Sequence, residues 1–133
     1  MATKSGILGL IIGVATVLII VSAVGENTDS QVSEIGIVEE SGFSKSCAEI
    51  DCYSPSVLTI KSGTVVIMTN TDETGVHTFT SGTVDGQTPI PDGNFDSNIL
   101  MVGDSYEHKF SQKGTYDYYC TLHTWMTGQI IVE

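Results

Sequence analysis

The chain has 133 residues, which beyond an apolar amino-terminal segment leaves room for one domain of about 100 residues and excludes a second. Five Lys, no Arg and sixteen acidic residues give a formal net charge of −11. This charge disfavours a nucleic-acid partner, because such binding depends on basic side chains that neutralise phosphates. It favours redox-partner proteins with basic docking surfaces; an acidic surface that serves only solubility is the alternative.

An uncharged apolar run covers Ile7–Val24, between Lys4 and Glu26. As a helix it would be about 27 Å long, enough to span a bilayer. The basic residue before the run predicts that the following domain lies on the extracytoplasmic face of the cell membrane. A cleaved signal peptide is the alternative, although the run exceeds the roughly 7–15 residues of a usual signal core. Residues 1–25 are therefore expected to be a membrane anchor, an amino-terminal transmembrane helix, or a signal segment.

Residues 26–31 are polar and are expected to form a short linker, so that the folded domain covers residues 32–133. Within it, Cys47 and Cys52 lie five residues apart in a polar stretch, whereas Cys120 stands alone. Outside the cytoplasm the first two can pair and leave one thiol. We predict a Cys47–Cys52 disulfide; two free thiols are the alternative.

Short β-branched or alternating segments, separated by turn signals, predict β-strands along the domain. The predicted strands are Val32–Val38, Val57–Ile60, Thr64–Thr69, a strand that begins at His77–Thr80, Ser105–Phe110, a strand from Gly114 to Cys120, and Ile130–Val132. Residues 81–98 contain three Gly and two Pro and are expected to be irregular. Many short strands without an amphipathic helix predict an all-β, antiparallel β-sandwich.

Alternation indicates which side chains of the last strands face the core. Tyr106, His108 and Phe110 share one face, and a lone histidine between aromatic residues is more often a core or rim residue than a metal ligand. Tyr116 shares the inward face of its strand with Cys120, and its position after the KGT turn predicts a tyrosine corner.

The segment YDYYCTLHTWMTGQIIVE places Cys120, His123 and Met126 in the spacing C-x2-H-x2-M. Thiolate, imidazole and thioether donors suit copper, because soft sulfur favours Cu(I) and imidazole serves either oxidation state. His77 follows a turn-rich loop upstream and supplies a second imidazole. Two His and one Cys in a plane with a weak axial Met form a blue-copper electron-transfer site, so the sequence predicts one copper ion that cycles between Cu(II) and Cu(I).

This pattern extends over most of the chain from residue 56 onward. Three segments carry it: SGTVVIMTNTDETGVHTF, DSNILMVGDSYEHKF and KGTYDYYCTLHTWMTGQIIV. Together they resemble the cupredoxin family, and most nearly its plastocyanin-, amicyanin- and halocyanin-like members. The resemblance implies a Greek-key, cupredoxin-like sandwich. It also implies that His77, Cys120 and His123 are equatorial copper ligands and that Met126 is the axial one.

Two positions depart from the family pattern: Thr124 stands where Pro is frequent, and Thr78 stands where many members carry Asn. Thr78 and Thr121 each follow an equatorial ligand, and we expect them to join the two ligand loops by hydrogen bonds and to tune the sulfur. Ordinary strand-end threonines are the alternative.

The resemblance also implies an electron-transfer surface, because the loop histidine of the family lies under an apolar patch and serves as its electron port. At the matching position, His123 has Leu122 and Trp125 as neighbours. Trp125 suits a partner contact or a lid that shields the copper. Tyr119, beside Cys120, is expected to face outward and to offer a second route.

These features predict a type 1 copper protein that acts as a membrane-tethered one-electron carrier between redox partners, rather than an enzyme. The alternative is a copper site whose accessible axial position oxidises or reduces a small molecule, which requires displacement of Met126. Beyond the two predicted ligands only His108 remains, too few histidines for an additional copper centre. A copper-delivery module is a third possibility, which the scattered Met residues do not favour.

Overall fold

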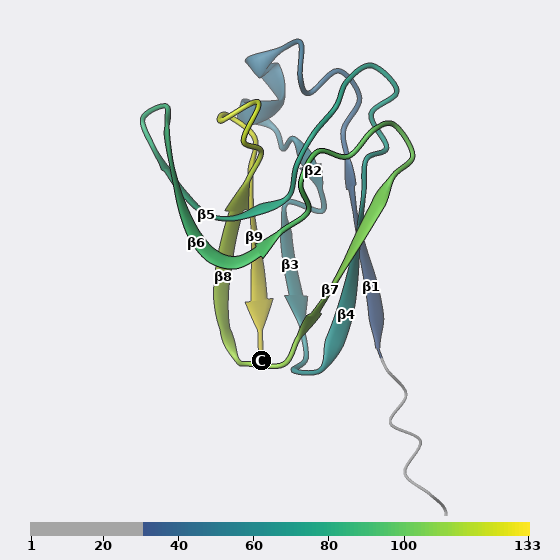
Figure 1. Ribbon diagram of the computed structural model, residues 1–133, viewed down its shortest axis with the longest axis vertical. Helices are drawn as coiled ribbons and strands as arrows, with labels where there is room; N and C mark the ends of the chain where they lie inside the picture. Colours follow the sequence, from purple (N-terminus) through teal and green to yellow (C-terminus); the bar gives the residue numbers. More distant parts are fainter. Residues whose placement is uncertain (1–30) are drawn as a thin grey trace, which may run out of the picture.

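A computed structural model describes residues 31–133, which form two packed β-sheets (Figure 1). The expected anchor, residues 1–25, and linker residues 26–30 lie outside the described residues. Between residues 31 and 133, no helix is long and apolar enough to cross a membrane. The strands are β1 (Val32–Ile37), β2 (Tyr53–Ser54), β3 (Val57–Ile60), β4 (Thr64–Thr69), β5 (Thr80–Asp85), β6 (Thr88–Asp96), β7 (Ser105–Phe110), β8 (Gly114–Tyr119) and β9 (Thr127–Val132), and a short 3₁₀ helix, η1 (Lys45–Glu49), precedes β2.

The sheets have the strand orders β2-β1-β4-β7 and β3-β9-β8-β5-β6. The predicted all-β sandwich is confirmed, but its description as antiparallel is wrong. Both sheets are mixed, because β1 pairs with β4 and β3 pairs with β9 in parallel. Parallel neighbours need a crossover connection, so these pairs join strands that are distant in the chain. Local alternation of residues carries no signal for such pairs.

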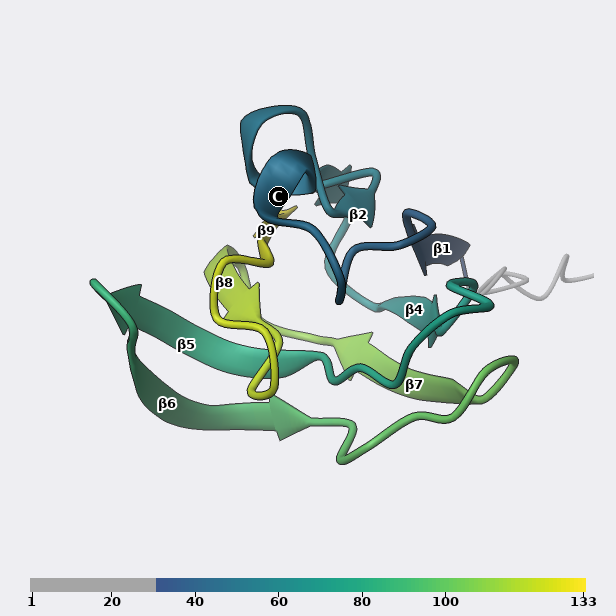
Figure 2. The same ribbon diagram turned by 90° about the horizontal axis from the view of Figure 1, so that it is seen from above.

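The expectation that residues 81–98 are irregular is also wrong, because β5 and β6 form a long antiparallel hairpin. β6 is an edge strand, where Pro89 and Pro91 are tolerated because one side of the strand needs no ladder hydrogen bonds. Gly82 lies beside a register shift with φ of +132°, and a Cβ there would lie 2.2 Å from the Ile90 carbonyl oxygen. Gly and Pro here mark a bulge and an edge. Figure 2 shows the hairpin curving away from the other sheet.

Apolar side chains from both sheets fill the space between them. Val66, Phe79 and Ile130 are fully buried, and each such side chain contributes about 1.5–3 kcal/mol to stability. The predicted tyrosine corner is present, since the Tyr116 hydroxyl donates to the Gln112 carbonyl at 2.9 Å. His108 also lies as predicted, with its ring centroid 5.3 Å from that of Phe95 and 4.8 Å from that of Phe110.

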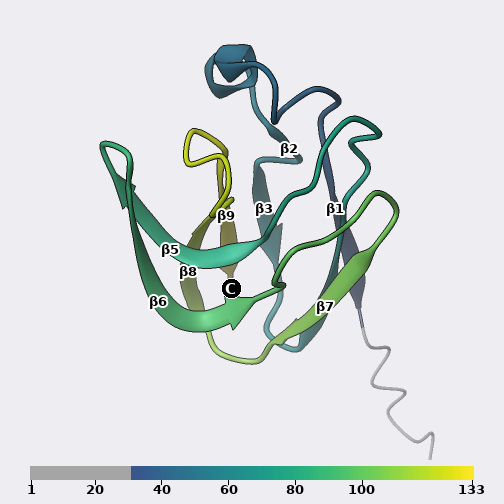
Figure 3. The same ribbon diagram turned by 45° about the horizontal axis from the view of Figure 1, so that its top comes forward.

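Three connections gather at the end of the sandwich opposite the carboxyl terminus (Figures 1 and 3). They are the β4–β5 loop, the β8–β9 loop and the segment between β1 and β2. The last contains the predicted Cys47–Cys52 disulfide, which is confirmed with Cα atoms 4.7 Å apart. Residues distant in the chain therefore meet on a rigid support.

Candidate metal centre

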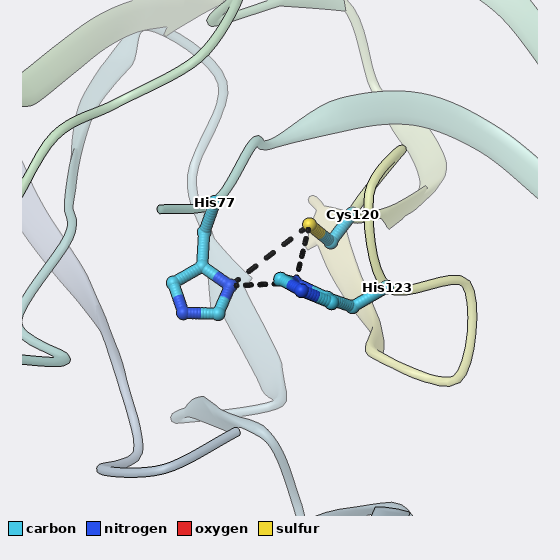
Figure 4. A group of neighbouring side chains, drawn as sticks. All are labelled: His77, Cys120 and His123. Carbon is cyan, nitrogen blue, oxygen red and sulfur yellow. Dashed lines mark hydrogen bonds between the residues drawn. The ribbon is translucent and has the colours of Figure 1, made fainter. Parts of the chain in front are cut away.

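Three side chains from two of these loops converge at the end of the sandwich (Figure 4). Nδ1 of His77 lies 4.0 Å from Sγ of Cys120, and Nδ1 of His123 lies 3.7 Å from the same sulfur. The two Nδ1 atoms are 3.3 Å apart. Within residues 31–133, this is the one group of His, Cys and acidic side chains whose donor atoms are close enough to share a metal ion.

The β4–β5 loop is held by Asn70, which is fully buried where β4 ends. Its amide nitrogen donates to the carbonyl oxygens of Gly75 and Leu100 at 2.9 and 3.0 Å. His77 and Leu100 then exchange two backbone hydrogen bonds, of 3.3 and 2.8 Å. This isolated bridge fixes His77 three residues before β5 begins, whereas the sequence predicted a strand starting at His77 itself.

The β8–β9 loop is short and closed by its own backbone. The Cys120 amide donates to the Met126 carbonyl at 3.1 Å, and the Met126 amide donates to the His123 carbonyl at 2.9 Å. Met126 is fully buried. One tight turn therefore presents a thiol, an imidazole and a thioether from the same end of β8.

The donor triangle has the dimensions of a trigonal metal site. Bonds of about 2.0 Å to nitrogen and about 2.3 Å to sulfur would separate the two nitrogens by roughly 3.5 Å and each nitrogen from the sulfur by roughly 3.7 Å. The observed separations are 3.3, 3.7 and 4.0 Å. Two imidazoles, one thiolate and a buried thioether are the donor set of a blue-copper site, so the residues fit copper.

A sequence model of copper-binding proteins of the plastocyanin/azurin family matches residues 46–133. The chain belongs to the cupredoxin family. This cupredoxin is 36% identical over 88 residues to amicyanin-alpha of Methylorubrum extorquens, a match that covers 65% of this chain and 67% of that protein.

Two solved structures extend the comparison. A purple cupredoxin from Nitrosopumilus maritimus is 34% identical with a TM-score of 0.61, over 76% of this chain and 99% of its own. A copper-containing nitrite reductase from Thermus scotoductus SA-01 is 32% identical with a TM-score of 0.51, over 61% of this chain but 20% of its own. Members of the family bind one copper ion, and here His77, Cys120, His123 and Met126 form the type 1 copper site.

The surroundings of the cupredoxin site favour the charged form of the thiol. Burial raises the pKa of Cys120, but hydrogen bonds from His77 and from backbone N–H groups, first that of Thr78, outweigh it and lower this pKa. Burial would lower the pKa of His77, yet its contacts with Cys120 and Asp72 raise it. Burial and the neighbouring His77 lower the pKa of His123. Because a thiolate is the form that binds metals, the site is prepared for a cation.

The two threonines connect the ligand loops as expected. The Thr78 amide donates to the Cys120 sulfur at 3.4 Å. The Thr121 amide donates to the Thr78 hydroxyl at 2.9 Å, and the two hydroxyls lie 3.3 Å apart. Thr78 thus fixes the thiolate and the following turn together, in the position where many family members carry Asn.

Sequence reasoning missed Asp72, whose Oδ2 lies 2.8 Å from Nε2 of His77. Both side chains are fully buried. Burial alone would raise the pKa of Asp72, but hydrogen bonds, first from Thr74 and then from His77 and the Glu40 amide, hold it well below its usual range. The only sequence signal was a carboxyl group five residues before a ligand in a polar loop, and most such groups are solvated.

The segment between β1 and β2 was also missed as part of the site. Trp125 donates its indole N–H to the Ser41 carbonyl at 2.9 Å. A Cβ on Gly42 would lie 2.9 Å from Cε1 of His123 and 3.3 Å from Cε1 of His77. The backbone of this segment therefore lies against both copper-binding imidazoles, which explains a glycine at position 42.

The expected electron-transfer residues differ in exposure. His123 and Trp125 are partly exposed, with ring centroids 5.2 Å apart, and Leu122 is 45% exposed. The expectation that Tyr119 lies at the surface is wrong, because it is 1% exposed. Alternation does place Tyr119 opposite the inward Tyr118, but β5 pairs with β8 at this position and brings the β5–β6 hairpin beside it.

Proposed function

We propose that this cupredoxin is a one-electron carrier, to which the bound copper supplies a single exchangeable electron between Cu(I) and Cu(II). The observation that carries the proposal is a closed donor set. His77, Cys120 and Met126 are fully buried, and His123 alone of the four ligands is partly exposed. Loops held by hydrogen bonds on a sandwich keep the donors in nearly one geometry, so little rearrangement accompanies the electron.

The proposed port for the electron is His123, because it joins the site to the surface. Leu122 and Trp125 beside it provide apolar contact area, and Lys45 lies 5.4 Å from the centre of the Trp125 ring. An aromatic side chain that is partly exposed next to a ligand suits a contact with another protein. In this proposal the partner is a redox protein that docks over the β8–β9 loop.

The proposed location is the outer face of the cell membrane, with residues 1–25 as the anchor and 26–31 as the linker. The support is the apolar run Ile7–Val24 preceded by Lys4. The Cys47–Cys52 disulfide also supports an oxidising compartment. Amino-terminal sequencing of the membrane-bound protein distinguishes an intact anchor from a cleaved signal.

The test is the absorption spectrum of the copper-loaded protein before and after addition of nitrite or azide. A carrier with a closed site keeps its intense charge-transfer colour unchanged and exchanges one electron reversibly. A large spectral shift on adding either anion would support instead the alternative of a site that reacts with small molecules.

Two variants control the ligand assignment. Cys120→Ser is expected to abolish the intense colour, because that colour depends on the copper–thiolate bond. Met126→Leu is expected to keep copper and colour but to change the reduction potential, because the axial contact is weak. Colour that persists in Cys120→Ser would show that the ligands have been assigned wrongly.

A further inference from the structure

Asp72 is a buried carboxylate whose two oxygens have separate partners. Oδ1 accepts hydrogen bonds from the Glu40 amide at 3.1 Å, the Thr74 amide at 2.9 Å and the Thr74 hydroxyl at 2.5 Å. Oδ2 has a single partner, Nε2 of His77 at 2.8 Å. The first oxygen therefore ties the side chain to two loops, and the second is directed at a copper ligand.

These partners also identify the charge on Asp72. Three hydrogen bonds donated to Oδ1 stabilise the ionised carboxylate and hold the pKa of Asp72 low, and an ionised carboxylate only accepts hydrogen bonds. The His77 ring nitrogen nearest Oδ2 must then carry its proton, which leaves Nδ1 free to face Cys120 and the metal. The contact thus selects one tautomer and one ring orientation of His77.

The Asp72–His77 contact is enclosed. Both side chains are fully buried, and a Cβ on Gly75 would lie 3.2 Å from Nε2 of His77 and 3.6 Å from Oδ2 of Asp72. A Cβ on Gly42 would lie 3.3 Å from Cε1 of His77. In a site that excludes water, a fixed negative charge acts strongly on its surroundings.

We propose that Asp72 is a positioning residue of the copper site, which holds His77 with Nδ1 toward the metal and stabilises Cu(II) relative to Cu(I). The Asp72 carboxylate makes the His77 imidazole a stronger electron-pair donor to the metal. The negative charge of Asp72 also offsets the extra positive charge of Cu(II). The reduction potential is therefore set partly from the β4–β5 loop, which supplies no metal ligand except His77. This inference deepens the proposed carrier function and rests on it for its biological role.

The test compares the reduction potentials of the wild type, Asp72→Asn and Asp72→Ser. Each variant removes the charge, and a Ser hydroxyl can still accept the Thr74 amide. We expect the preference for Cu(II) over Cu(I) to fall about tenfold, which is a rise of about 59 mV in a one-electron potential. Glu73→Gln is the matched control, because Glu73 is exposed on the same loop and loses the same formal charge. Its expected shift is several-fold smaller.

A second readout follows His77 directly. In the reduced, diamagnetic protein, we expect the His77 Nε2 proton to be protected from exchange with solvent in the wild type and Glu73→Gln. Its exchange should be at least tenfold faster in the Asp72 variants.

The proposal would be overturned if the reduction potential changed no more in the Asp72 variants than in Glu73→Gln, relative to the wild type. It would also be overturned if the exchange rate of the His77 Nε2 proton were the same in the Asp72 variants as in the wild type. Failure of both Asp72 variants to fold with coloured copper would also overturn it, because the role of Asp72 would then be structural. By contrast, a wild type that holds coloured copper but exchanges no electrons would contradict the carrier function alone.

Discussion

Two histidines of this cupredoxin differ in role because their surroundings differ. His77 has a carboxylate at 2.8 Å and a thiol at 4.0 Å, both of which favour a bound cation. His108 instead packs between Phe95 and Phe110, and burial lowers its pKa. The same side chain is therefore a ligand in one place and a partly buried neighbour of aromatic rings in the other.

The first prediction at this scale concerns the stability of His108→Phe at acid pH. The pKa of His108 is depressed in the folded protein, so below the ordinary value of about 6.5 the unfolded chain binds a proton that the folded chain does not. Stability is thus fully present above about pH 6.5 and falls as the pH drops below it. We expect His108→Phe to lose less stability than the wild type between pH 7.5 and 5.5.

Urea unfolding at both pH values, with both proteins in the same copper state, measures this difference. Other titrating groups are common to the two proteins and cancel. Equal losses of stability would contradict a lowered pKa of His108 in the folded protein.

The copper ligands could be predicted from sequence because three of them lie within one short turn, where C-x2-H-x2-M fixes their spacing. Asp72 could not be predicted, because its role depends on a loop that folds back onto His77 through Asn70. Tyr119 was assigned to the surface by alternation, which gives the face of a strand but not what covers that face. Its burial depends on the β5–β6 hairpin beside β8.

Among the elements, the segment between β1 and β2 acts as a support for the copper loop. The disulfide joins Cys47 in η1 to Cys52, the residue before β2. The same segment accepts the Trp125 indole N–H at Ser41 and lies against His123 through Gly42. Fixing this segment therefore also fixes the partly exposed side of the site.

The second prediction is that Cys47→Ser/Cys52→Ser lowers the free energy of unfolding by about 2 kcal/mol, the loop-closure contribution of a disulfide with so short a loop. Trp125 is the sole tryptophan of the chain, so its fluorescence should shift to the red as the segment loosens. Urea unfolding of the copper-free protein followed by this fluorescence measures both effects. Reductant should bring the wild type to the same stability, and a variant as stable as the wild type would show that the disulfide is dispensable.

β4, an apolar β-branched run, and β7, an alternating segment, were predicted with their observed bounds. β5 and β6 were not, because the Gly and Pro residues that signal a loop are equally suited to a bulge at Gly82 and an edge at Pro89. The error in the predicted elements therefore lies in this one hairpin, whereas the edge strands β3 and β7 were predicted with their observed bounds.

For the whole molecule, short alternating strands predicted the sandwich but not its strand order. The parallel pairs β1–β4 and β3–β9 join segments far apart in the chain, and their choice of partner depends on packing of the two sheets. The net charge, in contrast, follows from the composition of the whole chain and can be calculated without knowing the fold. It allows a prediction about encounter with partners.

The last prediction is that electron transfer to a basic redox protein depends on salt. The chain carries −11, and charge attraction raises the association rate most when the screening length is long, about 30 Å at 0.01 M salt. With a basic cytochrome c as the probe, we expect the second-order rate constant to fall roughly tenfold between about 0.01 and 0.3 M salt. Stopped-flow absorbance of the copper band measures this rate. The anion hexacyanoferrate(III) is the control, and its rate with the reduced protein should rise over the same range because like charges are then screened. A rate with the cytochrome that is independent of salt would show that the acidic surface serves solubility and does not steer partners.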